Sequence, residues 1–193
     1  MSDIFEFTAP KEAYNGTTKG VFVTEIEAED YLCGSAAVLR WFLVKRQVRA
    51  KPLFSHPSKT QIKEQYRFDV LLFPNDSLIN LGWTHGAVAI ECKKSGVKVG
   101  PGFSQALDYV NSCATGLDDF GGVLIVPSFA FLFPSITDGG PVASLQTQNR
   151  VGCAFEHENG IWEFYSGHTM VCKFDFCNFF IGRTKAGHKT GSR

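Results

Sequence analysis

The sequence predicts an α/β domain built around a mixed central β-sheet. Apolar residues recur at three- and four-residue spacing over 28–43, as they do along one face of a helix. Short apolar runs rich in branched and aromatic residues follow at 66–73 and 87–93, which is typical of buried strands. A second helical repeat at 103–114 separates these runs from further apolar segments. Helices and strands therefore alternate along the chain, as in the α/β class.

The first helix is expected to begin at a capping box. Thr24 and Glu27 form a T-x-x-E pattern, in which each side chain accepts a hydrogen bond from the other residue's backbone N–H. The apolar spacing predicts that this helix continues to about Gln47. Arg46 and Arg49 then lie at its C-terminal end, where the helix dipole favours cations.

Proline, glycine and serine mark the boundaries of the next elements. The elements expected between the two helices are a loop at 48–64, a strand at 66–73, a strand or hairpin arm at 78–83, a strand at 87–93 and a loop at 95–102.

Beyond the second helix the sequence predicts mainly strands. The expected elements are a buried strand at 121–126, a short apolar segment at 129–134, a hairpin formed by 151–156 and 161–165 around a turn at 157–160, and a last strand at 169–174. If the strands at 87–93 and 121–126 are parallel, residues 87–126 form a right-handed crossover.

Length and composition limit the class of protein. The chain has 193 residues, 44% of them hydrophobic, which fits a single domain at 1–193 with a sizeable core. Equal numbers of basic and acidic residues, 19 of each, exclude global disorder and a strongly basic nucleic-acid coat. The charge is unevenly placed, however, because residues 40–67 hold Glu64 as their only acid among many cations. A local basic face is therefore compatible with zero net charge.

Cysteine spacing and the N-terminus predict the compartment. None of the six cysteines forms a C-x-x-C pair, so they are interpreted as free thiols. The acidic N-terminus lacks the features of a signal peptide, and no apolar stretch is long enough to span a membrane. We expect a cytoplasmic protein without a membrane partner, or one in the host cytoplasm if a virus encodes it.

Polar residues in the predicted strands carry the candidate chemistry. Asp69 interrupts an apolar strand, where an acid is costly unless it is paired or bound to metal. Glu91 and Lys93 are two residues apart and share one face of their strand, whereas Cys92 points to the other. If the two strands are neighbours, Asp69 and Glu91 can converge on a cation such as Mg²⁺. Lys93 would then orient water or offset charge on a phosphate.

The helix that follows places two further polar groups on one face. Gln105 and Tyr109 are four residues apart, and this face begins just downstream of the Glu91–Lys93 strand end. We expect it to border the same site.

This arrangement resembles the PD-(D/E)xK nuclease superfamily, also called restriction-endonuclease-like. The motif is Asp69 followed by Glu91-Cys92-Lys93, and Gln105 to Tyr109 matches the Q-x-x-x-Y motif of its RecB-like branch. The resemblance covers about 24–126 and implies a restriction-endonuclease-like core, with 127–193 as a β-rich C-terminal extension. The 22-residue gap between Asp69 and Glu91 requires an inserted loop or strand, and Phe68 replaces the motif's proline.

The resemblance implies a Mg²⁺-dependent deoxyribonuclease, with Mn²⁺ as a substitute. Asp69, Glu91 and the carbonyl oxygen of Cys92 would bind the metal, and Lys93 would assist the water nucleophile. Gln105 and Tyr109 would position nucleic acid or the active-site groups.

The first helix would add an acidic residue to the site. Glu25, Glu27 and Glu29 compete for this role, and Glu27 is slightly favoured. The basic side chains expected to contact nucleic acid are Lys94, Lys98, Arg46 and Arg49.

Several alternatives stay open. Glu91 and Lys93 also fit an ordinary ion pair, and the chain also fits a non-catalytic module that binds nucleic acid or protein. A third alternative is a homodimer or a subunit that is active only in a larger nuclease complex. The sequence does not distinguish DNA from RNA, single strands from duplexes or junctions, or exonuclease from endonuclease activity.

Overall fold

The computed structural model describes residues 21–53, 66–96, 99–117, 124–134, 150–157, 159–167 and 169–182. The helices in these ranges are α1 (Glu25–Gly34), α2 (Ala36–Trp41), α3 (Asp76–Asn80) and α4 (Val99–Val110). The strands are β1 (Phe42–Pro52), β2 (Tyr66–Pro74), β3 (Val88–Cys92), β4 (Ser112–Ala114), β5 (Phe129–Phe133), β6 (Val151–Glu156), β7 (Trp162–Ser166), β8 (Thr169–Phe174) and β9 (Phe179–Ile181).

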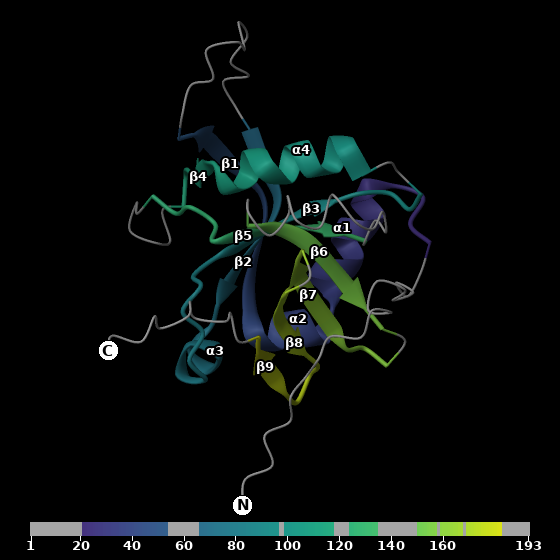
Figure 1. Ribbon diagram of the computed structural model, residues 1–193, viewed down its shortest axis with the longest axis vertical. Coiled ribbons are helices and arrows are strands. Elements are labelled where there is room, and N and C mark those ends of the chain that lie inside the picture. The colour runs from purple at the N-terminus through teal and green to yellow at the C-terminus, as the bar shows by residue number, and fades with distance from the viewer. Residues whose placement is uncertain are drawn as a thin grey trace, which may run out of the picture.

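The strands form one twisted mixed sheet in the order β4-β1-β2-β3-β5-β6-β7-β8-β9 (Figure 1). Pairing is antiparallel from β4 to β3, parallel from β3 through β5 to β6, and antiparallel from β6 to β9. The α/β class with a mixed sheet is therefore confirmed. In the part of the chain that is described, no helix is long and apolar enough to cross a membrane.

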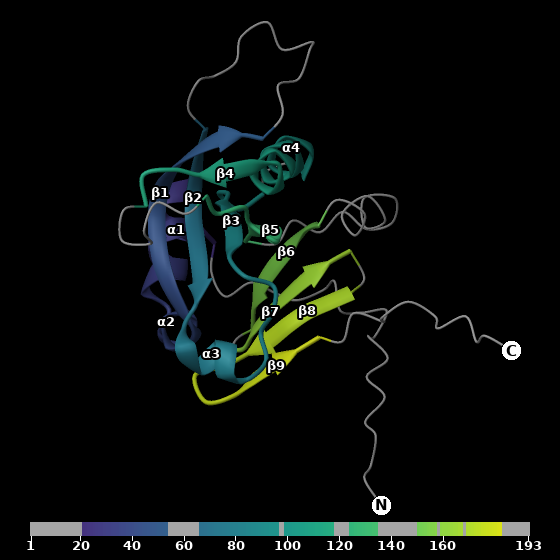
Figure 2. The ribbon, with the colours of Figure 1, turned by 90° about the vertical axis from the view of Figure 1, so that its left-hand side faces the viewer.

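Helices α1 and α2 cover one face of the sheet and α4 covers the other (Figure 2). Each face of the sheet has its own hydrophobic core. Leu32 of α1 and Trp41 of α2 pack in one cluster with Ile90 of β3. Ala106 of α4 packs in a second cluster with Ala89, the residue before Ile90. Because successive residues of a strand point to opposite faces, β3 separates the two cores, and both of its faces are buried.

The first helix is shorter than the sequence predicts. The capping box at Thr24 is confirmed, but α1 ends at Gly34 and Ser35 adopts an extended conformation with φ −65° and ψ 120°. The chain becomes strand β1 at Phe42, where it pairs with β2 from Phe42–Pro74 to Ala50–Tyr66. The predicted helix to about Gln47, and the loop expected at 48–52, are therefore wrong. Long-range pairing along the sheet overrides the local apolar spacing here.

Two predicted strands are also corrected. Residues 76–80 form α3 in place of the start of the expected strand at 78–83, and the Asn75 side chain caps it by accepting a hydrogen bond from the Leu78 N–H. Residues 124–126 contribute only an isolated bridge from Ile125 to Ala114, and Leu124 is 69% exposed. The rest of the predicted strand, 121–123, lies outside the described residues. The parallel neighbour of β3 is instead β5, whose residues 130–133 are fully buried.

The remaining elements match the predictions with shifted bounds. Helix α4 begins at Val99, inside the expected loop, and ends at Val110, so that residues 112–114 form β4. The β6–β7 hairpin and strand β8 are confirmed, and the short strand β9 follows them. None of the six cysteines forms a disulfide bond, as expected.

At Gln47 of strand β1, the side chains change the face of the sheet to which they point. This residue has φ 49°, in the left-handed region that non-glycine residues rarely adopt. Before it, Phe42 and Val44 pack with the α1–α2 core, whereas after it Val48 and Ala50 pack with the α4 core. Even-numbered residues of a regular strand would all share one face. The left-handed residue therefore turns the second half of β1 over.

Gly152 provides a test of how β6 packs against its neighbours. A Cβ atom at this position would lie 1.8 Å from the carbonyl oxygen of Tyr165 and 2.9 Å from Cδ1 of Phe131. We expect Gly152→Ala to lower the free energy of unfolding by at least about 3 kcal/mol, the upper end for overpacked sites, because a backbone oxygen cannot move aside. Urea denaturation measures this change. Gly34→Ala is the control, since no atom lies within 4 Å of its added Cβ. Equal effects of the two substitutions would contradict the close approach of the β6 and β7 backbones.

Candidate active site

The candidate site lies where β2 and β3 run side by side. The pairs Leu71–Ala89 and Val70–Ile90 place Asp69 next to Glu91 when the same register is continued. Oδ2 of Asp69 accepts a hydrogen bond of 2.9 Å from the backbone N–H of Cys92. The strands that carry the two carboxylates are therefore neighbours, as convergence on one cation requires.

Lys93 is held between two glutamates. Its Nζ forms an ion pair with Oε1 of Glu91 and a second, 3.0 Å long, with Oε1 of Glu25 on α1. A Cβ at Gly102 of α4 would lie 3.7 Å from both Cγ and Cε of Lys93, so α4 passes close to the lysine stem. Burial by itself would lower the pKa of Lys93, but the two ion pairs raise it above its ordinary value. The ammonium group is therefore charged and fixed in place.

The two carboxylates carry more negative charge than Lys93 offsets. Burial, and then the neighbouring charge of Glu91, raise the pKa of Asp69 to about 7, although the Cys92 N–H and Lys93 act in the opposite direction. Glu91 is 1% exposed, and its Oε2 has no hydrogen-bond partner among the described residues. A buried carboxylate oxygen without a partner is costly. The site would therefore be stabilised by a cation.

Tyr109 joins α4 to the carboxylate-bearing strand. Its hydroxyl oxygen accepts a hydrogen bond of 3.1 Å from the backbone N–H of Asp69, and its ring packs edge-on against Phe68 with 4.9 Å between centroids. Burial and the charges of Glu91 and Asp69 raise its pKa well above the ordinary value, so the phenol stays neutral. Tyr109 thus borders the site as predicted. Gln105 is exposed on α4, and no hydrogen bond joins it to the two carboxylates or Lys93 within the described ranges.

The three N-terminal glutamates have different positions. The carboxylate of Glu27 accepts hydrogen bonds from the backbone N–H groups of Val23 and Thr24, so it is used in the helix cap. Glu25 contacts Lys93. Glu29 is buried, and its charge contributes to the raised pKa of Asp69. The structure therefore brings Glu25 and Glu29, rather than the favoured Glu27, to the candidate site.

Glu29 is held by two residues that sequence reasoning did not connect with it. Arg46 donates from Nε to Oε1 of Glu29 over 2.6 Å, and Gln47 donates from Nε2 to Oε2 over 2.9 Å. The residues stand 17 and 18 positions after Glu29 in the sequence, so no local spacing links them. The left-handed conformation of Gln47 also has no signature in the sequence.

The predicted nucleic-acid contacts are not all available to a ligand. Arg46 lies on β1 rather than at a helix end, and besides Glu29 it contacts Asp30 through Nη2 at 2.6 Å. Arg49, also on β1, and Lys94, which follows Lys93, are exposed. Lys98 lies outside the described residues.

The metal prediction depends on a small protein ligand set. Among the residues that are described, no group of three or more histidine, cysteine, aspartate or glutamate side chains could hold a metal ion. The predicted set has two carboxylates, from Asp69 and Glu91, and the backbone oxygen of Cys92. Such a set suits Mg²⁺, which usually retains several waters and takes further oxygens from its substrate.

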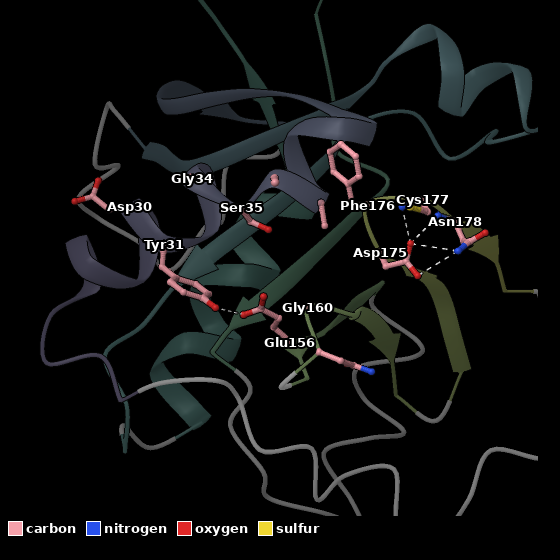
Figure 3. Close-up of a pocket in the computed structure, with 13 residues that line it drawn as sticks. Asp30, Tyr31, Gly34, Ser35, Glu156, Gly160, Asp175, Phe176, Cys177 and Asn178 are labelled. Carbon is pink, nitrogen blue, oxygen red and sulfur yellow. Dashed lines mark hydrogen bonds between the residues drawn. The ribbon is translucent and has the colours of Figure 1, made fainter.

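A pocket of about 670 Å³ lies elsewhere, between α1 and α2, the β6–β7 turn and the β8–β9 turn (Figure 3). Tyr31 donates a hydrogen bond to Glu156 inside it. Across the pocket, the Asp175 carboxylate accepts hydrogen bonds from the backbone N–H groups of Cys177 and Asn178. None of the predicted site residues that the structure describes lines this pocket.

Comparison with protein-family models, with curated proteins and with solved structures finds no match for this chain.

Proposed function

We propose that the chain is a metal-dependent nuclease that hydrolyses phosphodiester bonds in DNA at the Asp69–Glu91–Lys93 site. The observation that carries this proposal is the buried Oε2 of Glu91, which lacks a hydrogen-bond partner among the described residues and lies beside a second carboxylate. The proposal includes a restriction-endonuclease-like core. It is supported by the order of the motif residues, with Asp69 and Glu91 on neighbouring strands and Tyr109 on the following helix.

The residues present fit a divalent cation of the magnesium type. Asp69, Glu91 and the Cys92 carbonyl oxygen would hold it, since hard oxygen ligands suit Mg²⁺. A bound cation would polarise the phosphoryl oxygen and lower the pKa of a bound water.

The protein groups around the carboxylates have positioning roles in this proposal. Lys93, fixed by Glu25 and Glu91, holds a positive charge where negative charge develops on the phosphate. Tyr109 holds the backbone of Asp69, and the Cys92 N–H orients the Asp69 carboxylate. Both contacts limit the movement of a group that must be placed accurately for catalysis.

Metal dependence is the first test of this function. The purified chain should cut DNA in Mg²⁺ or Mn²⁺ and stop when EDTA is added, as measured on labelled single- and double-stranded DNA with RNA in parallel. Lys93→Ala should slow cutting by about 100-fold or more, the usual loss when one charge-stabilising donor is removed. Cutting that persists in EDTA, or an unchanged rate in Lys93→Ala, would contradict the assignment. Tight DNA binding without cleavage in either metal would instead support a binding module.

A further inference from the structure

The outer end of the β1–β2 pair carries like charges directly opposite each other. Arg49 on β1 and Arg67 on β2 are cross-strand partners, and both are exposed. Lys51 lies two residues beyond Arg49, so it faces the same side of the strand. Side chains of directly opposed residues stand roughly 5 Å apart at Cβ, and like charges in such pairs are destabilising. The pair therefore carries an electrostatic cost that a bound anion would reduce.

No acidic side chain offsets this charge within the described ranges. Arg49, Lys51 and Arg67 form no ion pair there, whereas Arg46 on the same strand is bound by both Glu29 and Asp30. Arg46 is thus neutralised within the described residues, whereas Arg49, Lys51 and Arg67 are not.

At this end of β1 and β2, one face is buried in a hydrophobic core, whereas the face that carries the cations is exposed. Val48, Ala50 and Phe68 alternate with the cations and are buried in the core beneath α4. The reversal at Gln47 produces this arrangement, because it turns Val48 and Ala50 toward α4 and leaves Arg49 and Lys51 on the exposed side. The basic face therefore points away from the core.

This basic face lies next to the candidate site. Arg67 precedes Asp69 by two residues on β2, a separation of about 7 Å at the usual strand rise. The pairs Arg46–Val70 and Val48–Phe68 bracket Gln47 and Asp69, so Arg49 is also two residues beyond the level of Asp69. Both arginines are therefore two residues along the strands from the level of Asp69.

We propose that Arg49, Arg67 and Lys51 form a clamp for the phosphate backbone of nucleic acid beside the Asp69–Glu91 site. Guanidinium groups bind phosphate oxygens through paired N–H donors, and a phosphate between two arginines removes their mutual repulsion. The carboxylates repel a polyanion, so the cations that hold it must lie outside them. The role of the clamp in cleavage rests on the proposed nuclease function, but its binding of phosphate does not.

Binding without turnover tests the clamp. Fluorescence anisotropy with a labelled DNA 30-mer, in EDTA and over a range of salt concentrations, compares the unmodified chain with the double variant Arg49→Gln/Arg67→Gln. We expect at least tenfold weaker binding, and a slope of log K against log salt that is less steep by about 1.4 for single strands or 1.8 for duplex, as two lost phosphate contacts require. Both residues are exposed, so the double variant should fold, which circular dichroism checks.

The matched control is Arg40→Gln. Arg40 is exposed and stacks on Trp41 with 4.7 Å from Cζ to the ring centroid, so its substitution removes a charge away from the clamp. It should leave the affinity and the salt slope unchanged. Absence of DNA binding by the unmodified chain, an unchanged slope in the double variant, or equal losses in the Arg40 control would overturn the clamp.

The same measurements separate the clamp from the proposed chemistry. Salt-dependent binding through the arginines without cleavage in any metal would contradict the nuclease function but leave the clamp standing. Cleavage with an unchanged KM in the double variant would contradict the clamp but leave the nuclease function standing. Polyglutamate is added as a competitor of DNA. If it displaces DNA, and if the double variant loses more affinity for polyglutamate than for DNA, the basic face binds an acidic protein and the clamp is overturned.

Discussion

Glu91→Gln is expected to reduce metal-dependent DNA cleavage by about 1000-fold or more, the upper end of losses when an essential charge-stabilising group is removed. The substitution keeps the size of the side chain but removes the charge that would hold the cation and that pairs with Lys93. Gel-based cleavage at saturating Mg²⁺ measures the rate, and Mn²⁺ binding measured by calorimetry should weaken in parallel. Lys93 retains its contact with Glu25, so the lysine stays partnered in this variant.

Glu163→Gln is the control for this prediction. Glu163 is also buried and forms an ion pair with Lys173 at 2.7 Å, and its carboxylate lies 3.1 Å from Nε2 of His157, but it lies on β7. Its substitution removes an equivalent charge and should leave the cleavage rate unchanged. A Glu91→Gln variant that cuts DNA at the original rate would show that Glu91 and Lys93 form only a structural ion pair.

Asp69→Asn is expected to raise the free energy of unfolding at pH 8 in the absence of metal. The pKa of Asp69 is about 7 in the folded protein, against 3.8 for the ordinary carboxyl, because burial and Glu91 disfavour the charged form. The folded state therefore holds this proton more tightly than the unfolded state. Ionisation of Asp69 therefore destabilises the folded unmodified chain. This destabilisation is absent below about pH 4, grows as the pH rises, and is complete above about pH 7. One pKa unit corresponds to about 1.4 kcal/mol, so the gain at pH 8 should be a few kcal/mol.

Urea denaturation of the two proteins between pH 4 and pH 8 measures this difference. The variant should be more stable at pH 8 and nearly equal at pH 4, and Mg²⁺ should raise the Tm of the unmodified chain more than that of the variant. Asp175→Asn is the control with the opposite sign, since the backbone N–H groups of Asn178 and Cys177 lower the pKa of Asp175. Its substitution should destabilise the protein at pH 8. A difference between Asp69→Asn and the unmodified chain that does not change with pH would contradict the buried carboxylate pair.

Local sequence patterns predicted several elements correctly because their signals are short-ranged. The T-x-x-E pattern placed the start of α1 at Thr24, since a capping box involves residues three apart. The apolar strands that contain Asp69 and Glu91 were recognised from their composition and from the turns that end them. The face shared by Glu91 and Lys93 followed from strand alternation, and the ion pair between them agrees with it.

The errors arose where a run of apolar residues fits more than one element. Residues 42–47 continue a helical spacing and also form a good strand, and pairing with β2 decides between them. The same ambiguity led to the prediction of a buried strand at 121–126, whereas contact with β3 and β6 identifies β5 as the central parallel strand.

The sequence by itself determined the α/β class, the two carboxylates with their lysine, and the uneven charge beneath a net charge of zero. These properties depend on residue identity and on spacings of a few positions. Tertiary structure alone decided that Glu25 and Glu29 rather than Glu27 approach the site, that Arg46 is neutralised, and that Arg49 faces Arg67. The physical reason is that these contacts join residues 17 to 68 positions apart, and that the left-handed turn at Gln47 decides which side of β1 each charge occupies.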